Sequence, residues 1–450
     1  MTRKVKIISI LSLLVVCLYA GWEFIIIGQT SHRYYSYSIG EGRNDGIKRL
    51  YCGTSSAEVL ELSFEDGEWE MKSCGKANNL SFCNISTVTV GDGRGDGVNR
   101  IYAAVQDGYV YEYSYENEQW KVEKVGGASN WVTGGADVGI PRNDGVMRVV
   151  GAGYTSTREF TWNGNDWDEL IICPGNIDFW AVNIDDGRGD GLNRIYSSDG
   201  HQSNNCIREY SWNGTEYTEM QLNAPNQMIK TAIGPARNDG KNRVYGAGRF
   251  GHVYEFTWEN DQWNMIDIQD ETSPLLSRYG LEVGMEDDGK YYVYSTAQSG
   301  DTRRHSYLNN QWEEEIVESV TGATVNIGFG DARNDGKQRL YIAAIGKTYE
   351  CFPPEVYIGE QAIPKGIDLK NYPNPFNPET QISFEIYENS DVSMMIYNSK
   401  GQIIDKLYNG MLNSGYHEFT FDGSNLVSGV YYCKIYIGKV EYTRAMNLVK

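Results

Sequence analysis

The sequence predicts an all-β protein, a seven-bladed β-propeller followed by a small Ig-like β-sandwich, and three observations lead to this prediction. A turn phrase, in which Asp-Gly and two further residues precede Arg, an aliphatic residue and usually Tyr, recurs seven times between residues 40 and 341. A second phrase, ending in Trp or Tyr, follows six of these copies. The 33 Tyr, 11 Trp and 50 Gly, without an amphipathic helical pattern after residue 30, favour short strands joined by tight turns.

The spacing of the turn phrase gives the number and size of the blades. Successive copies lie 46 to 51 residues apart, and a period of roughly 40 to 50 residues is typical of four-stranded propeller blades. Repetition also explains how so long a chain folds, because one hydrophobic core rarely grows beyond about 250 to 300 residues. The Asp residues shared by the seven copies are Asp45, Asp96, Asp144, Asp190, Asp239, Asp288 and Asp335.

Each repeat contains four segments with the composition of β-strands, most clearly in the second copy, at residues 86–90, 100–105, 109–115 and 119–125. These segments alternate in polarity or are rich in β-branched and aromatic residues, which predicts one antiparallel sheet per repeat. Asn, Asp and Gly at the centre of the second phrase suit a tight hairpin between the third and fourth strands. We expect the aromatic residue that ends this phrase to pack between neighbouring sheets rather than to stack on a ligand.

The closing strand of the ring is the one part of the propeller that the repeats leave open. The seventh copy departs from the pattern after residue 347, so its outer strand must come from elsewhere. Residues 355–358 and residues 33–38 both have suitable β-forming residues. We expect the propeller to span residues 31–359, closed by a strand from one terminus.

Proline marks the end of the repeats. Six of the eleven Pro residues lie between residues 353 and 378, where β-ladder formation is expected to stop. We therefore expect a Pro-rich linker over residues 360–379 and a β-sandwich over residues 380–450. The predicted strands of this sandwich are residues 381–386, 392–397, 416–421, 429–437 and 440–448.

Residues 1–30 are predicted to be a signal peptide with cleavage near Ala20. Three basic residues precede an apolar run over residues 7–20, which is the pattern of a secretory signal. A retained membrane anchor that extends to Ile27 is the alternative, although Glu23 interrupts it.

Charge and cysteine content exclude several classes of protein. The formal net charge is -20, whereas a nucleic-acid-binding protein needs clustered Lys and Arg. The eight Cys residues include no Cys-x-x-Cys pair, so a metal cluster is not expected. We expect buried single thiols; export permits disulfides, but spacing alone cannot assign a pairing such as Cys74 with Cys83.

The C-terminal residues resemble a known family. The motifs NYPNPFNPETQISFEI (371–386), VSMMIYNSKGQIIDKLYNG (392–410), GYHEFTFDGSNLVSGVYYCKI (415–435) and RAMNLVK (444–450) occur in this order. They closely resemble the type A C-terminal sorting domain of the type IX secretion system, over about residues 365–450. The resemblance implies export by the outer-membrane secretion machinery, so that the protein is secreted or held at the surface of a bacterium with an outer membrane. An ordinary adhesive sandwich is the alternative.

The proline motif of this region is expected to stiffen the entry to the sandwich and to leave backbone carbonyls without matching donors. Its residues are Pro373, Asn374, Pro375, Phe376, Asn377 and Pro378.

The turn phrase resembles FG-GAP and VCBS propeller repeats, in which an Asp-rich loop between the first two strands holds calcium. The match is partial, because Arg333 and Arg339 stand at the third and ninth loop positions, where such loops usually have Asp or Asn. The resemblance implies weak calcium candidates at Asp92, Asp96, Asp186, Asp190, Asp331 and Asp335.

An ion pair within each turn is the competing interpretation of the same residues. Two guanidinium groups would repel a cation, whereas Asp beside Arg can form a bidentate, charge-assisted hydrogen bond. We therefore expect structural Asp–Arg bridges in place of a metal, and no cofactor. The predicted pairs are Asp45 with Arg49, Asp96 with Arg100, Asp144 with Arg148, Asp190 with Arg194, Asp239 with Arg243 and Asp335 with Arg339.

Function is less well determined than fold. The sequence has no nucleophile elbow, zinc-protease helix or phosphate-binding loop, and its five His are scattered, so no catalytic residue is assigned. We expect a binding role, for a glycan or another surface macromolecule, through loops at one end of the ring. A carbohydrate-active hydrolase or lyase with a carboxylate pair near the axis, or a purely structural adhesion component, are the alternatives. Irregular insertions at residues 199–205 and 299–304 are where asymmetry is expected.

Overall fold

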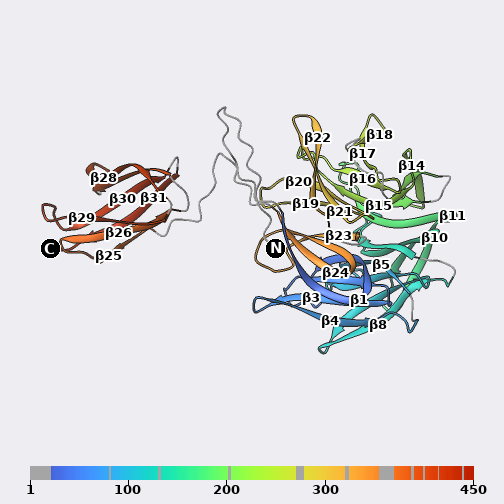
Figure 1. The fold of residues 1–450 in the computed structure, drawn as a ribbon. Helices are drawn as coiled ribbons and strands as arrows, with labels where there is room; N and C mark the ends of the chain where they lie inside the picture. The colour runs from blue at the N-terminus through green and yellow to red at the C-terminus, as the bar shows by residue number, and fades with distance from the viewer. Residues whose placement is uncertain are drawn as a thin grey trace. The chain divides into compact units, whose positions relative to one another are not determined.

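The computed structural model consists of β-strands in two compact units, one within residues 20–354 and the other within residues 355–450 (Figure 1). Among the described residues, no helix is long and apolar enough to cross a membrane. The expected signal segment up to residue 21 and the candidate closing strand at 355–358 lie outside the described residues. The structure describes residues 22–80, 83–129, 133–200, 204–269, 278–319, 324–353, 369–386, 390–398, 401–413, 415–437 and 440–450.

The first unit is a seven-bladed β-propeller, and each blade is a four-stranded antiparallel sheet whose strands we name A to D from the axis outward. Long strands serve two positions: β10 supplies B and C of blade 3, and β11 supplies D of blade 3 and A of blade 4. The strands of blades 1 to 4 are β1 (Glu23–Gly40), β2 (Arg49–Thr54), β3 (Glu58–Glu65), β4 (Glu68–Lys76), β5 (Ile85–Gly91), β6 (Arg100–Val105), β7 (Tyr109–Glu116), β8 (Gln119–Gly127), β9 (Thr133–Gly139), β10 (Arg148–Trp162), β11 (Trp167–Asp185), β12 (Arg194–Asp199), β13 (Cys206–Trp212) and β14 (Tyr217–Asn223).

Blades 5 to 7 follow the same plan, and β24 supplies both B and C of blade 7. Their strands are β15 (Met228–Gly234), β16 (Arg243–Gly248), β17 (Val253–Glu259), β18 (Gln262–Asp267), β19 (Arg278–Met285), β20 (Tyr291–Ala297), β21 (Asp301–Leu308), β22 (Gln311–Ser319), β23 (Thr324–Gly330) and β24 (Arg339–Phe352).

The innermost strands join the seven blades into a closed ring. Strands β1, β5, β9, β11, β15, β19 and β23 each pack against the innermost strands of the two neighbouring blades. The B strands lie next to them, and β2, β6, β12 and β16 are buried along their whole length. The propeller therefore has many small cores between blades in place of one central core, as expected of a repeat architecture.

The N-terminal strand closes the ring, at residues earlier than the sequence predicted. Residues 23–29 of β1 pair with the second half of β24 and form strand D of blade 7. Residues 34–40, which include most of the predicted closing segment 33–38, instead pair with β2 as strand A of blade 1. The propeller thus begins at Glu23 and not at residue 31, so that residues 23–30, expected in the signal segment, belong to it. The error arose because one long strand serves two blades.

Aromatic contacts between neighbouring blades continue across this closure. The aromatic side chain at the start of strand D packs edge-on against the strand-B Tyr of the preceding blade in most blades, as in Trp120 with Tyr51, whose ring centroids are 6.0 Å apart at 81°. Trp22 takes this position in blade 7 and lies 6.3 Å from Tyr294 at 87°. The recurring aromatic residue is therefore used for packing between sheets, as predicted. The other pairs are Trp69 with Tyr341, Trp167 with Tyr102, Trp263 with Tyr196 and Trp312 with Tyr245.

The second unit is a small β-sandwich. One sheet has the order β25-β26-β29 and the other β28-β27-β30-β31, and apolar side chains such as Phe384, Ile396 and Ile435 form the core of this unit. Two of its seven strands, β25 and β28, were not predicted. The strands are β25 (Lys370–Tyr372), β26 (Glu379–Ile386), β27 (Ser390–Asn398), β28 (Ile403–Leu412), β29 (Gly415–Asp422), β30 (Gly429–Ile437) and β31 (Val440–Leu448).

The proline motif belongs to this sandwich and not to a linker, which corrects the predicted boundary at residue 380. Phe376 is 1% exposed, and its backbone N–H donates to the Asn447 carbonyl at 2.9 Å. The expectation of unmatched carbonyls is wrong for two prolines, because Pro373 O accepts from the Thr380 hydroxyl at 2.8 Å and Pro378 O accepts from Gly423 N–H at 2.8 Å. Phe376 is thus bonded to the end of β31, whereas Pro373 is bonded to β26 and Pro378 to the residue that follows β29.

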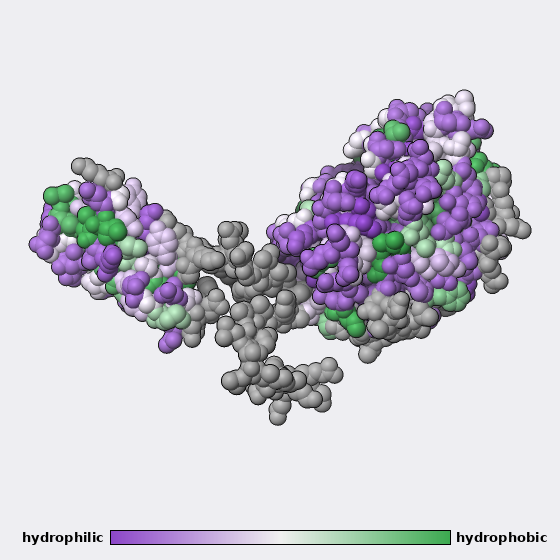
Figure 2. All heavy atoms as spheres, turned by 90° about the horizontal axis from the view of Figure 1, so that it is seen from above, coloured by the Kyte–Doolittle hydropathy of each residue, from purple (hydrophilic) through white to green (hydrophobic). Residues whose placement is uncertain are grey.

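The described cysteines form no disulfide bonds with one another, and all but Cys173 are buried. Cys74 and Cys83 both lie in the core between blades 1 and 2 without a bond between them. The surface is mainly hydrophilic in the view of Figure 2, with small apolar patches.

Candidate functional site

The predicted Asp and Arg residues meet in the turn between strands A and B. In six blades the two terminal nitrogens of Arg donate to the two carboxylate oxygens of the Asp four residues earlier, at 2.6 to 2.9 Å. The Arg side chains are buried, and the Asp side chains are 38 to 43% exposed. The pairs are Asp45–Arg49, Asp96–Arg100, Asp144–Arg148, Asp190–Arg194, Asp239–Arg243 and Asp335–Arg339.

These hydrogen bonds favour the ionised carboxylates. The Arg100 guanidinium, with help from the Val98 backbone N–H, lowers the pKa of Asp96 to about 2. The corresponding Arg in each case also lowers the pKa of Asp144, Asp239 and Asp335 to about 2. Each pair therefore stays charged at any pH at which the protein is expected to work.

A buried glutamate on strand C completes each cluster, and the sequence analysis missed it. Glu112 is 1% exposed and accepts 3.0 and 2.5 Å hydrogen bonds from Arg94, the residue two before Asp96, while Arg100 Nε lies 3.6 Å away. The signal was visible, because Glu stands two residues before the Ser or Thr of the hairpin phrase in five copies. The same pairs are Arg43–Glu61, Arg142–Glu159, Arg188–Glu209, Arg237–Glu255 and Arg333–Glu350.

The turn Arg also reaches the next blade. The Arg94 guanidinium lies 4.0 Å from the ring centroid of Trp162 in blade 3, and the equivalent residues of five other blades make similar contacts at 3.6 to 4.7 Å. Each such Arg thus binds a glutamate of its own blade and an aromatic face of its neighbour. The repeated charged residues therefore hold the ring together.

Blade 6 keeps this contact with the charges exchanged. Its turn carries Glu286 where the other blades have Arg, and strand C carries Arg304 where they have Glu; Arg304 Nη1 lies 2.7 and 2.8 Å from the two Glu286 oxygens. The second Arg is replaced by Tyr292, whose hydroxyl donates to Asp288 at 2.8 Å.

The calcium candidates use their carboxylate oxygens within the turns. Asp92 accepts from the backbone N–H groups of Asp96 and Gly97 at 3.1 and 2.7 Å. Asp186 and Asp331 make the same two contacts in their own turns. The remaining candidates, Asp96, Asp190 and Asp335, bind guanidinium groups. Among the described residues there is no group of three or more His, Cys, Asp or Glu placed to hold a metal ion.

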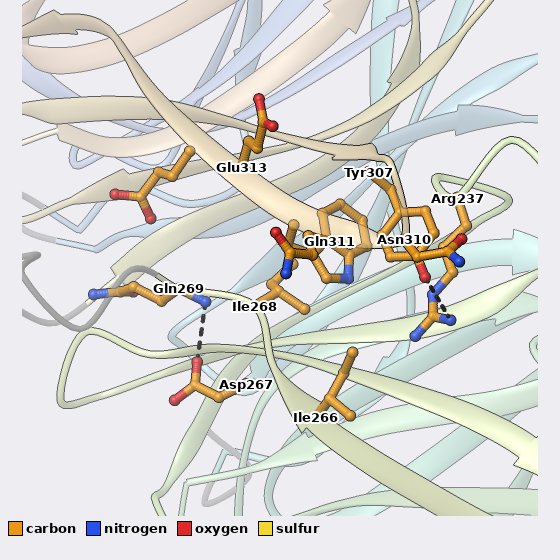
Figure 3. Close-up of a pocket in the computed structure, with 11 residues that line it drawn as sticks. Arg237, Ile266, Asp267, Ile268, Gln269, Tyr307, Asn310, Gln311 and Glu313 are labelled. Carbon is orange, nitrogen blue, oxygen red and sulfur yellow. Dashed lines mark hydrogen bonds between the residues drawn. The ribbon is translucent and has the colours of Figure 1, made fainter.

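A groove between blades 5 and 6 is a candidate binding site of the described structure (Figure 3). It encloses about 740 Å³ and runs along the outer strand β18 of blade 5, facing the β21–β22 hairpin of blade 6. Its lining is aromatic, amide-rich and acidic, and consists of Arg237, Ile266, Asp267, Ile268, Gln269, Tyr307, Asn310, Gln311, Trp312, Glu313 and Glu314.

The walls of this groove are held by contacts of the scaffold. Arg237 lies over the Tyr307 ring at 4.6 Å, and the rings of Tyr307 and Trp312 are 5.3 Å apart. On the other wall, Asp267 contacts His252 Nδ1 at 2.5 Å and accepts from Gln269 N–H at 3.1 Å. Gln311 and Glu313 are exposed. The groove therefore combines rigid aromatic and carboxylate groups with exposed hydrogen-bonding side chains.

Three titratable residues lie on innermost strands without repeating from blade to blade. Burial raises the pKa of Glu282 to about 7 and that of Asp137 to about 6, and it lowers the pKa of Lys230 to about 8. The strand registers align Asp137 of blade 3 with Glu282 of blade 6. The residues at the same position in blades 1, 2 and 5 are Ser38, Thr89 and Ala232. These charges distinguish blades 3, 5 and 6 from the others.

Comparison with known proteins identifies the second unit. Residues 370–448 match the family model described as the secretion system C-terminal sorting domain. This domain marks proteins secreted to the cell surface or extracellular space of Gram-negative bacteria, and it implies an interaction with the type IX secretion machinery. No curated protein matches the chain.

Solved structures support the propeller fold of the first unit. BBS1N, in a crystal structure with ARL6DN, is 12% identical with a TM-score of 0.52, and the match covers 75% of this chain and 97% of that one. YCF48 from Cyanidioschyzon merolae is 12% identical with a TM-score of 0.50, over 75% of this chain and 100% of that one. Raptor from Chaetomium thermophilum is 12% identical with a TM-score of 0.52, over 75% of this chain and 29% of that one. At this identity the likeness concerns the fold alone.

Proposed function

Because its sorting domain marks the protein for export, we propose that it is an extracellular binding protein whose propeller recognises a glycan in the groove between blades 5 and 6. The lining of that groove carries the proposal. The exposed side chains of Gln311 and Glu313 can bond hydroxyl groups, and Ile266, which is 40% exposed, adds an apolar surface beside them, a mixture that suits a carbohydrate.

A single asymmetric site agrees better with the repeats than a lectin with one site per blade. The residues that recur in the blades bind each other: Asp and Glu bind Arg, and the hairpin aromatic residue packs on the preceding blade. The groove instead includes side chains that change from blade to blade, such as Glu313, whose equivalent in blade 2 is Lys121. The repeats thus supply the scaffold and one blade boundary supplies the recognition.

A glycan array probed with the purified protein tests the proposal. We expect binding to a restricted set of oligosaccharides, reduced at least about tenfold in the double variant Gln311→Ala/Glu313→Ala, since each lost hydrogen bond to a ligand contributes about 1 kcal/mol. The matched control is Gln119→Ala/Lys121→Ala on the equivalent hairpin of blade 2, which should bind normally. Equal loss in both variants, or no binding to any glycan, would contradict the proposal.

The enzyme alternative is tested in the same experiment. Carbohydrate-active enzymes act through a pair of carboxyl groups, and the groove contains Asp267, Glu313 and Glu314. Bound oligosaccharides are therefore incubated with the protein and analysed for new reducing ends or unsaturated products. We expect none, and turnover would assign the protein to the enzymes.

A further inference from the structure

A second, smaller cavity lies between blades 4 and 5, where Asn205, just before strand C of blade 4, faces the turn between β16 and β17 of blade 5. It encloses about 440 Å³. Unlike the groove between blades 5 and 6, it has no carboxylate among its described lining residues. These residues are Asn205, Pro225, Asn226, Gln227, Arg249 and Phe250.

The turn that carries Phe250 has the same length in four blades, which allows a comparison position by position. The strand registers of blades 1, 2, 5 and 6 align Phe250 with Ser56, Asp107 and Ser299. Ser56 is buried and lies 3.0 Å from the Thr54 hydroxyl, and Asp107 accepts from Asn78 and Tyr111 at 2.7 Å each. Phe250 is instead 54% exposed.

Backbone hydrogen bonds define the turn that carries Phe250. Gly248 N–H donates to the His252 carbonyl at 2.8 Å, and Gly251 N–H donates to the Gly248 carbonyl at 3.2 Å. Gly251 has φ of 93°, a conformation in which glycine is favoured. Blade 5 thus has a rigid turn with an apolar ring in the position where blades 1 and 2 have a polar residue with internal partners. Folding alone does not require this exchange.

Arg249 is specific to blade 5 in the same way. Its equivalents are Ser55, Gln106 and Gln298. The Arg249 backbone N–H donates to the Gln227 carbonyl at 2.9 Å, and its Nη1 donates to Gln227 Oε1 at 3.1 Å. Gln227 is 6% exposed, so the buried amide positions the guanidinium at the wall of the cavity.

Two further amides line the cavity in defined orientations. Asn226 Nδ2 donates to the Tyr254 hydroxyl at 2.7 Å, and Asn205 Nδ2 donates to the Pro225 carbonyl at 3.3 Å. Each amide also has a carbonyl oxygen that accepts hydrogen bonds. The cavity therefore offers an aromatic face, a guanidinium group and amide acceptors.

We propose that this cavity binds a sugar that carries a carboxylate, a uronic acid. The C–H face of the pyranose ring would pack on Phe250, its carboxylate would bind Arg249, and its hydroxyl groups would donate to the amide oxygens. Arg forms bidentate, charge-assisted hydrogen bonds with carboxylates, and the described lining residues of the cavity include no carboxylate that would repel the ligand in this protein of formal charge -20. This site differs in place and chemistry from the acidic groove.

Calorimetry with tetragalacturonate and with its fully methyl-esterified form tests the proposal, since the two probes share the sugar and differ in charge. We expect the acid to bind the purified protein and the ester to bind at least about tenfold more weakly, the loss expected for one charge-assisted hydrogen bond. Equal affinity for both forms, or no binding of the acid, would overturn the proposal.

Two variants taken from equivalent turns assign the contacts without disturbing the fold. Arg249→Gln introduces the residue of blades 2 and 6 and should lower the affinity for the acid to that for the ester. Phe250→Ser introduces the residue of blades 1 and 6 and should lower the affinity for both the acid and the ester. Failure of either variant to change binding would also overturn the proposal. The groove variant Gln311→Ala/Glu313→Ala should bind the acid normally, so this result is independent of the proposed glycan site. If that variant instead lost its affinity for the acid, the acid would bind in the groove and the proposal would be overturned.

Discussion

Blade 6 and the other six blades hold the same buried ion pair with opposite polarity. In blade 2 the turn Arg94 binds Glu112 on strand C, whereas in blade 6 the turn Glu286 binds Arg304. The Arg that follows in the other turns is Tyr292 in blade 6, and the Arg304 guanidinium lies 4.5 Å from the centroid of the Tyr292 ring. The comparison teaches that the fold requires complementary charges at this position and not a particular residue, and that changing one partner requires changing its neighbours.

The largest effect is expected from removing one partner of a buried pair. Glu112→Ala leaves Arg94 and Arg100 without their shared carboxylate, and the loss of one partner of a buried pair costs about 3 to 5 kcal/mol of unfolding free energy. The triple variant Arg94→Glu/Arg100→Tyr/Glu112→Arg, which copies blade 6, should recover more than half of this loss. Urea unfolding measures both variants. A triple variant no more stable than Glu112→Ala would show that the two polarities are not interchangeable.

Acid should weaken the Asp–Arg turns of the six blades that contain them. The pKa of Asp96, Asp144, Asp239 and Asp335 is about 2 in the folded protein against an ordinary 3.8. Because the folded pKa is lowered, the stabilisation is present above pH 3.8 and is lost as the pH falls towards 2. The partly exposed pairs are expected to contribute about 0.5 to 1 kcal/mol each.

Denaturant unfolding at pH 5 and pH 2.5 measures this loss. Asp96→Asn should reduce the difference between the two pH values, and Asp288→Asn in blade 6, where Tyr292 is the partner, serves as the control. An equal response of both variants would argue against guanidinium stabilisation of the six turns.

Glu282 of blade 6 should destabilise the protein at alkaline pH. Burial raises its pKa to about 7, and Lys230 offsets part of this effect. Because the folded pKa is raised, the favourable contribution is present below the unfolded pKa of 4.5 and is lost as the pH rises through 7. Glu282→Gln should therefore match the natural protein near pH 4 and exceed its unfolding free energy by about 1 to 3 kcal/mol at pH 8.5. A gain that does not depend on pH would contradict this account.

The smallest effect is expected where the turns already vary. Asn44 donates to the Asn99 carbonyl and accepts from its N–H at 2.9 and 2.7 Å, joining blades 1 and 2, while blades 2 and 4 have Gly95 and Gly189 at this position. Asn44 has φ of 58°, so that Asn44→Gly loses two hydrogen bonds but relieves the backbone. Thermal unfolding should show a change below about 1 kcal/mol. A loss of several kcal/mol would mean that the contacts between turns control ring stability.

Much of the fold was predictable because most blades are formed by one contiguous repeat with its own recurring motifs. The spacing of the turn phrase gave seven blades, and the predicted strands at 429–437 and 440–448 coincide with β30 and β31. The Asp and Arg of each turn were predictable because residues four apart in a tight turn lie close together. Glu112 was missed because its partner Arg94 lies 18 residues away, on the other side of strand B.

The sequence by itself determined the repeat, the strands within it and the short-range ion pairs, since all of these depend on neighbouring residues and on the periodicity of polar and apolar side chains. Only the tertiary structure decided which strand closes the ring and where the cavities lie. Closure brings together residues about 300 positions apart, as when the Tyr37 hydroxyl donates to the Thr348 hydroxyl at 2.8 Å, and no local pattern encodes such a contact. The cavities likewise form between blades, so their linings exist only once the ring is closed.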